Sequence, residues 1–156
     1  MVREIRPEEF CLLTDFLYDA IFVPPGEIPP DKSIIDKPEL RVYTENFGGM
    51  KDDKCLVADA DGEIAGAVWC RIMDDYGHVD DETPSLALSV KKEYRRRGIG
   101  TALVREMLGL LRRSGYARVS LSVQKANFAV NMYTSLGFRI FSGNDREYIM
   151  LAELGG

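Results

Sequence analysis

The residues best suited to chemistry form a short basic turn, RRRGIG, at residues 95–100. Before it, Leu86, Leu88 and Val90 alternate with small residues, a period typical of a strand with one face on a core. From Ile99 onward the apolar residues recur with a helical period. A helix start leaves about four N–H groups unpaired and carries roughly half a positive charge, so it attracts phosphate oxygens. The pattern predicts a phosphate site at the turn, although a plain strand-to-helix turn with a solvated charge run fits the spacing equally well.

Two glycines in this turn would let main-chain N–H groups approach a bulky anion. Gly98 and Gly100 lack a Cβ, and glycine tolerates a positive φ. The arginines add a positive field, and Thr101 adds a hydroxyl donor. The P-loop pattern is absent because no Gly-Lys pair exists, and the dinucleotide fingerprint is absent because Leu103 stands where its third glycine belongs. What remains is the pattern R-x-x-G-x-G.

The segment VKKEYRRRGIGTALV, residues 90–104, resembles the acetyl-CoA motif of the GNAT superfamily of acyl-CoA-dependent N-acetyltransferases, Q/R-x-x-G-x-G/A. A second segment, NFAVNMYTSLGF at residues 127–138, is similar to the family's N-x-x-A-x-x-x-Y-x-x-x-G-F segment. Tyr133 stands five residues before Phe138, as in the family, whereas Asn127 is one residue closer to the tyrosine than the pattern requires. The two motifs together make the resemblance far more specific than either alone.

The resemblance implies a binding mode for acetyl-CoA as the cosubstrate, with no metal. The strand ending at Val90 would be splayed from the strand ending at Val123, and the pantetheine arm would lie in the gap between them. The pyrophosphate would sit on the amides of the turn, and an amine would attack the thioester carbonyl directly. The implied cofactor-binding residues are Leu88, Ser89, Val90, Arg95, Arg96, Arg97, Gly98, Ile99, Gly100, Thr101, Asn127 and Tyr133.

The resemblance makes Tyr133 the candidate general acid for the thiolate of CoA. A phenol with a pKa of about 10 stays protonated at neutral pH. A half-buried helix tyrosine with a satisfied hydroxyl is the alternative reading of the same residue. Glu82 is the candidate base, with Asp81 and His78 as alternatives, because the family often carries a carboxylate just before the cofactor strand. An exposed acidic loop that only attracts a cationic amine explains these residues equally well.

Composition narrows the class of protein. The 156 residues, with a formal charge of -5 and 46% hydrophobic residues, predict one globular domain that buries about two-thirds of its unfolded surface. The acidity argues against wholesale nucleic-acid binding, and no apolar run approaches a membrane span. The start of the chain has no pattern of a signal peptide or a myristoylation site. Cys11, Cys55 and Cys70 are odd in number and widely spaced, which argues against disulfides and zinc. We expect a reduced, cytoplasmic environment.

The remaining patterns predict an α+β fold. Their order, β-α-α-β-β-β-α-β-α-β-β, is also that of the GNAT fold, a three-layer α/β/α arrangement around a mixed, mostly antiparallel twisted sheet of about seven strands with four helices. An Asp-Gly pair at residues 61–62 is a strong hairpin signal. Residues 55–151 are expected to form the acetyl-CoA-binding core and residues 1–50 a helical acceptor-side region. The expected strands are 2–6, 55–59, 63–73, 85–90, 118–123, 138–141 and 147–151, and the expected helices are 7–18, 37–47, 99–113 and 127–136.

The predicted activity is transfer of an acetyl group from acetyl-CoA to a primary amine of a small molecule or peptide, in a ternary complex. A polyamine, an amino acid, an aminoglycoside and a protein N-terminus all remain possible acceptors, and a homodimer is possible. A non-catalytic acyl-CoA sensor is the first alternative, and a nucleic-acid binder using residues 91–97 is the second. Aromatic residues of the first two helices could line the acceptor pocket, although such residues are more often core: Tyr18, Phe22, Tyr43 and Phe47.

Overall fold

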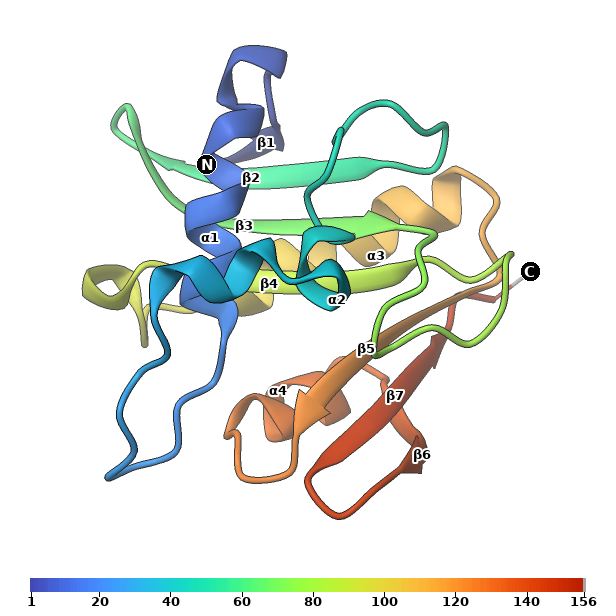
Figure 1. Ribbon diagram of the computed structural model, residues 1–156. Helices are drawn as coiled ribbons and strands as arrows, with labels where there is room; N and C mark the ends of the chain where they lie inside the picture. Colours follow the sequence, from blue (N-terminus) through green and yellow to red (C-terminus); the bar gives the residue numbers. More distant parts are fainter. Residues whose placement is uncertain (156) are drawn as a thin grey trace.

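A seven-stranded sheet in the order β1-β2-β3-β4-β5-β7-β6 runs through the computed structural model, which describes residues 1–155 (Figure 1). Neighbouring strands are antiparallel except β4 and β5, which are parallel. The predicted mixed, mostly antiparallel sheet is therefore confirmed. The strands are β1 (Val2–Glu4), β2 (Lys54–Ala60), β3 (Glu63–Arg71), β4 (Ser85–Val90), β5 (Arg118–Gln124), β6 (Arg139–Gly143) and β7 (Glu147–Glu153).

Helices cover both faces of the sheet, which gives the three layers expected. In Figure 1, α1 and α2 lie in front of β3 and β4, and α3 lies behind them. The α-helices are α1 (Leu13–Ala20), α2 (Pro38–Arg41), α3 (Ile99–Arg113) and α4 (Ala129–Ser135). Three 3₁₀ segments accompany them, at Pro7–Leu12, Lys32–Asp36 and Lys92–Tyr94.

Helix α3 holds the core on the rear face. Its residues Leu103, Val104, Met107 and Leu111 are fully buried, whereas Arg105 is exposed, so the helical period predicted from the sequence is confirmed. They pack with residues of β2 to β5 and of α4 in one hydrophobic cluster. Each fully buried side chain of this kind stabilises the fold by about 1.5–3 kcal/mol. This cluster fixes the start of α3 relative to β4.

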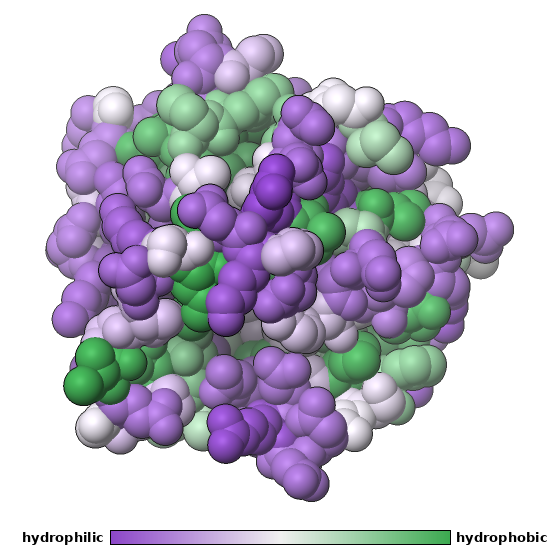
Figure 2. Space-filling view, in the orientation of Figure 1, coloured by the Kyte–Doolittle hydropathy of each residue, from purple (hydrophilic) through white to green (hydrophobic). Residues whose placement is uncertain are grey.

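The front face has a separate core around Trp69, which is fully buried in β3. Its ring nitrogen donates a hydrogen bond to the Tyr43 carbonyl, 3.0 Å away. Leu13, Phe16 and Leu17 of α1 belong to the same cluster. The N-terminal region is thereby packed onto the sheet. Figure 2 shows that the outer surface of this face is mostly hydrophilic, with separate hydrophobic patches.

The first two helices are shorter than predicted. Residues 7–12 form a 3₁₀ segment before α1, and the helix expected over residues 37–47 is reduced to the four residues of α2. Arg71 of β3 explains the second difference, because its Nη1 donates to the carbonyls of Val42 (3.0 Å) and Glu45 (2.8 Å). These carbonyls therefore find partners outside a helix, and the chain continues in turns.

The hairpin predicted at Asp61 and Gly62 forms as expected. Both residues have positive φ, 55° and 93°, as the common two-residue hairpin turn requires. The Asp59 side chain accepts a hydrogen bond from the Gly62 amide at 2.8 Å. The turn sets the register of β2 against β3, and β3 in turn aligns β4.

No helix within residues 1–155 has the length and apolar character needed to cross a bilayer. The three cysteines are free thiols, with Cys55 and Cys70 buried in the sheet and Cys11 exposed. Burial raises the pKa of the Cys55 and Cys70 thiols well above its usual range. The two buried thiols are therefore protonated packing groups rather than reactive ones.

Candidate active site

Strands β4 and β5 form a wedge-shaped opening in the sheet. They pair at a single position, Ser85 with Ser120, and Figure 1 shows β5 diverging from β4 beyond that pair. The Ser120 amide donates to the Pro84 carbonyl, 3.0 Å away, which closes the narrow end. Residues 86–90 therefore present to the wedge a β4 edge that has no paired strand within residues 1–155. We call it the open edge.

The register between β3 and β4 determines which main-chain groups reach the open edge. The Lys91 amide donates to the Ala65 carbonyl at 2.8 Å, and alternate residues of β4 bond to β3 in the same way. The main-chain groups of Leu88 and Val90 therefore face the wedge. Those of Ser89 face β3, and its side chain is buried. Ser89, which the sequence predicted as a cofactor-binding residue, therefore lies away from the opening.

The amides from Arg96 to Thr101 have no hydrogen-bond acceptor within the described residues. The first amide of this region with a partner is that of Ala102, which donates to the Gly98 carbonyl at 3.0 Å. Arg96 and Gly98 have φ of 65° and 78°, and alternating left-handed residues turn successive N–H groups into one concavity that suits an anion. We call this set of six amides the amide cradle. The 15-residue helix α3 begins inside it and adds the positive end of its dipole.

The three arginines of the turn have different contacts. Arg95 Nε donates to the Val90 carbonyl at 3.0 Å, which ties the turn to the end of β4. The Arg97 guanidinium lies over the Tyr94 ring, 5.4 Å from its centroid. Arg96 supplies the left-handed backbone of the cradle. From the sequence we expected these arginines to act together as one positive patch. In the structure, Arg95 also positions the turn against the end of β4.

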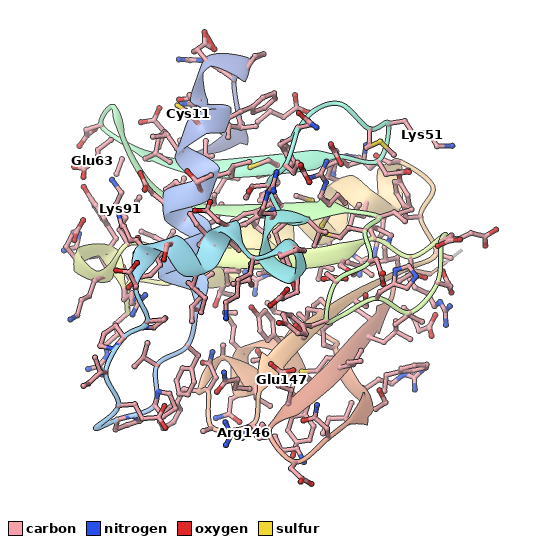
Figure 3. The ribbon with its side chains drawn as sticks, in the orientation of Figure 1. Cys11, Lys51, Glu63, Lys91, Arg146 and Glu147 are labelled. Carbon is pink, nitrogen blue, oxygen red and sulfur yellow. The ribbon has the colours of Figure 1, made fainter. Side chains whose placement is uncertain are left out.

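A charged pair braces one side of the cradle. Lys91 Nζ lies 3.5 Å from Glu63 Oε1, and Figure 3 shows the two labelled residues on neighbouring segments. The Tyr94 hydroxyl donates to Glu63 Oε2 at 2.9 Å. These contacts hold the 3₁₀ segment Lys92–Tyr94 against the start of β3, so they fix the entry to the turn.

Tyr133 lies on α4, in the hydrophobic cluster of the rear face. Its side chain is 7% exposed and packs edge-on against Phe138, with ring centroids 5.6 Å apart. Burial raises the pKa of the phenol well above its usual range, so it stays protonated at neutral pH. No protein group within residues 1–155 hydrogen-bonds its hydroxyl, which leaves the proton free for a ligand. The neighbouring Met132 sulfur is 3.7 Å from where a Cβ on Gly100 would lie, so α4 approaches the cradle.

Asn127 has a capping contact. Its Oδ1 accepts a hydrogen bond from the Ala129 amide at 2.9 Å. This local bond satisfies the first amide of α4, which begins at Ala129 rather than at residue 127. A contact of Asn127 with CoA stays a prediction.

The acidic loop after β3 is fixed at the closed end of the wedge. Asp80 pairs with Arg118 at the start of β5, and its other oxygen accepts from the Glu82 amide at 2.9 Å. His78 Nδ1 is 2.8 Å from the Met73 carbonyl, and its Nε2 is 3.5 Å from Asp81. Glu82 itself is exposed. These contacts place Glu82, the base predicted from the sequence, before the Ser85–Ser120 pair rather than along the open edge.

A polar cluster that no sequence pattern singled out lies at the apex of the wedge. Asp75 accepts a hydrogen bond from the Ser85 hydroxyl at 2.8 Å. The Tyr43 hydroxyl lies near both Asp75 and Ser122 of β5. Burial raises the pKa of Asp75, and burial together with this carboxylate raises the pKa of Tyr43. The only sequence signal for this cluster is the serines at alternate positions of β4 and β5, which indicate one polar face on each strand.

The other aromatic residues proposed for an acceptor pocket contact neighbouring loops. The Tyr18 hydroxyl donates to the Pro30 carbonyl, and Phe47 packs edge-on against Phe10 at 5.5 Å. Phe22 is partly exposed in the loop after α1. Among the four, Tyr43 is the one whose hydroxyl lies near a residue of β5, Ser122.

Comparisons with known proteins agree with this architecture. The model of the acetyltransferase (GNAT) family matches residues 17–138. An N-alpha-acetyltransferase from Sulfurisphaera tokodaii is 31% identical over 115 residues, covering 64% of this chain and 68% of that protein. A probable N-acetyltransferase camello from Xenopus tropicalis is 33% identical over 94 residues, covering 58% of this chain and 41% of that protein. The chain thus spans about two-fifths of the length of the camello protein.

A solved structure shares the fold along almost the whole chain. The PaiA N-acetyltransferase from Thermoplasma acidophilum in complex with coenzyme A superposes with a TM-score of 0.71 at 19% identity, covering 98% of each chain. The family match extends from α1 to the end of α4 and includes the wedge, the amide cradle and Tyr133. The chain therefore belongs to the GNAT family of acetyltransferases.

Proposed function

We propose that this chain transfers an acetyl group from acetyl-CoA to a primary amine, by direct transfer in a ternary complex. The observation that carries the proposal is the amide cradle, which combines six unpaired amides with the start of a long helix and adjoins the open edge of β4. A diphosphate is the anion whose size and charge suit such a site. Family membership and the coenzyme A bound to the PaiA relative support the choice of CoA.

The residues present offer hydrogen-bond partners to two parts of a CoA molecule. Its diphosphate would accept hydrogen bonds from the cradle, and its pantetheine arm carries amide groups that can pair with a strand edge. Leu88 offers both of its main-chain groups at the open edge, whereas Val90 offers its N–H because Arg95 occupies its carbonyl. The arm would then run along β4 from the cradle towards the Ser85–Ser120 pair.

Tyr133 is the proposed general acid. After the amine attacks the thioester carbonyl and the C–S bond breaks, the phenol would give its proton to the sulfur of CoA. Its raised pKa and its unpartnered hydroxyl suit this role, because the group stays protonated until a partner arrives. Phe138 fixes the ring orientation.

The acceptor is proposed to be a primary amine of a small molecule or a peptide. The S. tokodaii relative is an N-alpha-acetyltransferase, which supports an α-amine among these acceptors. The camello relative is a probable N-acetyltransferase, which supports transfer to nitrogen in general. A homodimer and a cytoplasmic place of action stay predictions of the sequence.

The test is release of free CoA thiol by the purified chain with acetyl-CoA and a panel of amines. We expect turnover with at least one amine, and Tyr133→Phe should lower kcat by about 10- to 1,000-fold with little change in the Kd of CoA. Tyr148→Phe is the matched control, since Tyr148 lies on β7, which β5 separates from the open edge of β4, and it should keep full activity.

Other outcomes would change the assignment. Tight CoA binding without turnover on any amine would favour the sensor. Full activity of Tyr133→Phe would make the tyrosine a packing residue. Indifference to CoA combined with strongly salt-dependent nucleic-acid binding would favour the nucleic-acid binder.

A further inference from the structure

The proposed reaction needs a proton acceptor for the amine. A primary amine enters as an ammonium ion at neutral pH, and it can attack a thioester only after losing a proton. We propose that the Asp75 carboxylate is this general base, and that Ser85 and Tyr43 are its positioning residues. The inference rests on the proposed function, and it replaces Glu82 as the base.

The loop after β3 is built to hold Asp75 at the apex of the wedge. The Ser85 hydroxyl donates to Asp75 Oδ1 at 2.8 Å. Two residues further along, the Gly77 carbonyl accepts from the Ser120 hydroxyl at 2.7 Å. A Cβ on Gly77 would lie 3.0 Å from the Ser122 amide nitrogen, so this part of the loop lies directly against β5. The carboxylate is therefore bonded to β4, and the loop that carries it is bonded to β5, at the point where the two strands part.

Tyr43, in the turn after α2, also lies near the Asp75 carboxylate. Its hydroxyl lies near Asp75 and Ser122, close enough for the Asp75 carboxylate to act on its pKa, and its side chain is 7% exposed. Its main chain is held in turn by Trp69, whose ring nitrogen donates to the Tyr43 carbonyl at 3.0 Å. A fixed phenol beside a carboxylate restricts the direction from which an ammonium group can approach.

The exposure of Asp75 suits a group that meets a substrate. The residue is partly exposed. Within residues 1–155, no lysine, arginine or histidine forms an ion pair with Asp75. An incoming ammonium would therefore be the first cation to reach the carboxylate.

Asp75 and Tyr133 belong to opposite faces of the sheet. Tyr43 belongs to the front hydrophobic cluster with Trp69, whereas Tyr133 belongs to the rear cluster with Leu86 and residues of β5. The base and the acid therefore approach the wedge from opposite sides. A thioester carbonyl placed between them would meet the amine on the Asp75 side and release its sulfur towards the Tyr133 side.

The protons balance with these two groups. Asp75 takes one proton from the ammonium ion, and the neutral amine forms the new C–N bond. The C–S bond breaks, the thiolate takes the phenol proton of Tyr133, and the phenolate recovers a proton from the nitrogen of the new amide. Asp75 then releases its proton to water. The ammonium group thus loses two protons, of which one ends on the CoA thiol and one in solvent.

The groups around Asp75 in the described chain, none of them a charged side chain, set the expected pH dependence. The groups that face it are Tyr43 from the turn after α2, Ser85 from β4 and the amide of Gly77 on its own loop. Burial, together with the carboxylates of Glu39 of α2 and Glu147 of β7, raises the pKa of the adjacent Tyr76; Glu147 is labelled in Figure 3. Burial raises the pKa of Asp75, so kcat/KM should rise with pH as this carboxyl ionises.

The test compares Asp75→Asn with Asp74→Asn in the acetyl-transfer assay over a range of pH. Asp75→Asn should lower kcat/KM at neutral pH by about 100- to 10,000-fold while leaving the Kd of CoA unchanged. The loss should shrink tenfold per pH unit as the amine deprotonates in solution. Asp74→Asn removes the same charge from an exposed neighbouring position and should keep the wild-type profile.

Two further variants protect the test against a folding defect. Tyr43→Phe and Ser85→Ala keep the carboxylate, so each should shift the acidic limb of the pH profile with a smaller loss of kcat/KM. An unchanged rate and pH profile in Asp75→Asn, with the wild type active, would overturn the inference alone. If Asp75→Asn fails to fold, an unchanged acidic limb in both Tyr43→Phe and Ser85→Ala overturns it instead. Absence of turnover in the wild type would overturn the proposed function together with it.

Discussion

Arg95 Nε donates a hydrogen bond to the Val90 carbonyl, 3.0 Å away, and so connects the amide cradle to the end of β4. The bond spans the turn that separates a strand edge from a helix start. It gives the first arginine of the R-x-x-G-x-G motif a geometric role that charge alone would not explain. A lysine at this position keeps the charge but has no planar guanidinium to make the same contact.

We therefore expect both Arg95→Lys and Arg95→Ala to weaken CoA binding by about 2- to 10-fold, the value of one lost hydrogen bond. Titration calorimetry with CoA would measure the effect. The control is Arg105→Ala, which removes an equal charge from the exposed side of α3. If Arg95→Lys binds CoA like the wild type, the arginine contributes charge and not geometry.

Gly98 is required for its backbone conformation. Its φ of 78° lies in the left-handed region, and nothing lies within 4 Å of where a Cβ would be. Gly98→Ala should therefore cost about 1–2 kcal/mol of stability from backbone strain alone, and it should weaken CoA binding as the cradle relaxes. Gly100→Ala is the comparison, because its Cβ would meet Leu88 Cδ2 at an ordinary 3.5 Å. Thermal unfolding should show no loss for Gly100→Ala, and an equal loss in both variants would contradict the argument.

The Ser89 hydroxyl is fully shielded from solvent and has no hydrogen-bond partner in the described chain. An unpaired buried hydroxyl costs about 1–3 kcal/mol, so Ser89→Ala should leave the protein as stable or raise its stability by about 1 kcal/mol. CoA affinity should not change, since the main chain of Ser89 pairs with β3. Urea titration and CoA titration of the same variant check both statements. Weaker CoA binding would return Ser89 to the cofactor site.

Asp53 and Arg71 form a buried ion pair, with side-chain exposures of 0% and 6%. Asp53 also accepts hydrogen bonds from the amides of Gly48 and Met50. Asp53→Asn would leave Arg71 as an uncompensated buried cation and should cost about 3–5 kcal/mol in urea unfolding. Arg41→Ala breaks the exposed pair with Glu45 and should cost about 0.5 kcal/mol or less. Similar losses in the two variants would show that the buried pair is not a special element of the fold.

The interactions of Glu9 should make the free energy of unfolding decrease at acid pH. Its hydrogen bonds with Arg3 hold the pKa of the carboxyl at about 2. The unfolded value is about 4.3, so the ionised form stabilises the fold above that pH, and the contribution is lost as the pH falls towards the folded pKa. Glu9→Gln should unfold at a lower temperature than the wild type at pH 7, and the two midpoints should converge near pH 2. Glu8→Gln, at an exposed neighbouring position, should follow the wild type at every pH.

The sequence predicted the parts of the fold that depend on local patterns. The stripe of α3, the Asp-Gly hairpin and the bounds of β4 were all confirmed, because each depends on residues close together in the chain. The expected single core face of β4 was wrong, because Ser85 and Ser89 are buried as well. The second helix was wrong beyond Arg41, because Arg71 of a distant strand takes the carbonyls that a longer helix would have used.

In the candidate site, too, the parts that form locally were predictable and the parts that need the assembled sheet were not. The amide cradle was predictable, because a glycine turn before a helix forms locally. The contact of Arg95 with Val90 and the apex around Asp75 were not, because they require the sheet to be assembled. Asp75 stands ten residues before Ser85 in a run of acidic residues, and no spacing distinguishes it from Glu82. The loop path that separates them is fixed by contacts of Gly77 with β5.

The single Ser85–Ser120 pair makes the sheet two ribbons, β1 to β4 and β5 to β7, hinged at one point. A molecule that bonds to Leu88 and Val90 while touching α4 would link the two ribbons where no strand pairing joins them. Occupancy of the gap should therefore slow amide hydrogen exchange in both ribbons at once, and the ligand would stiffen the protein as a whole.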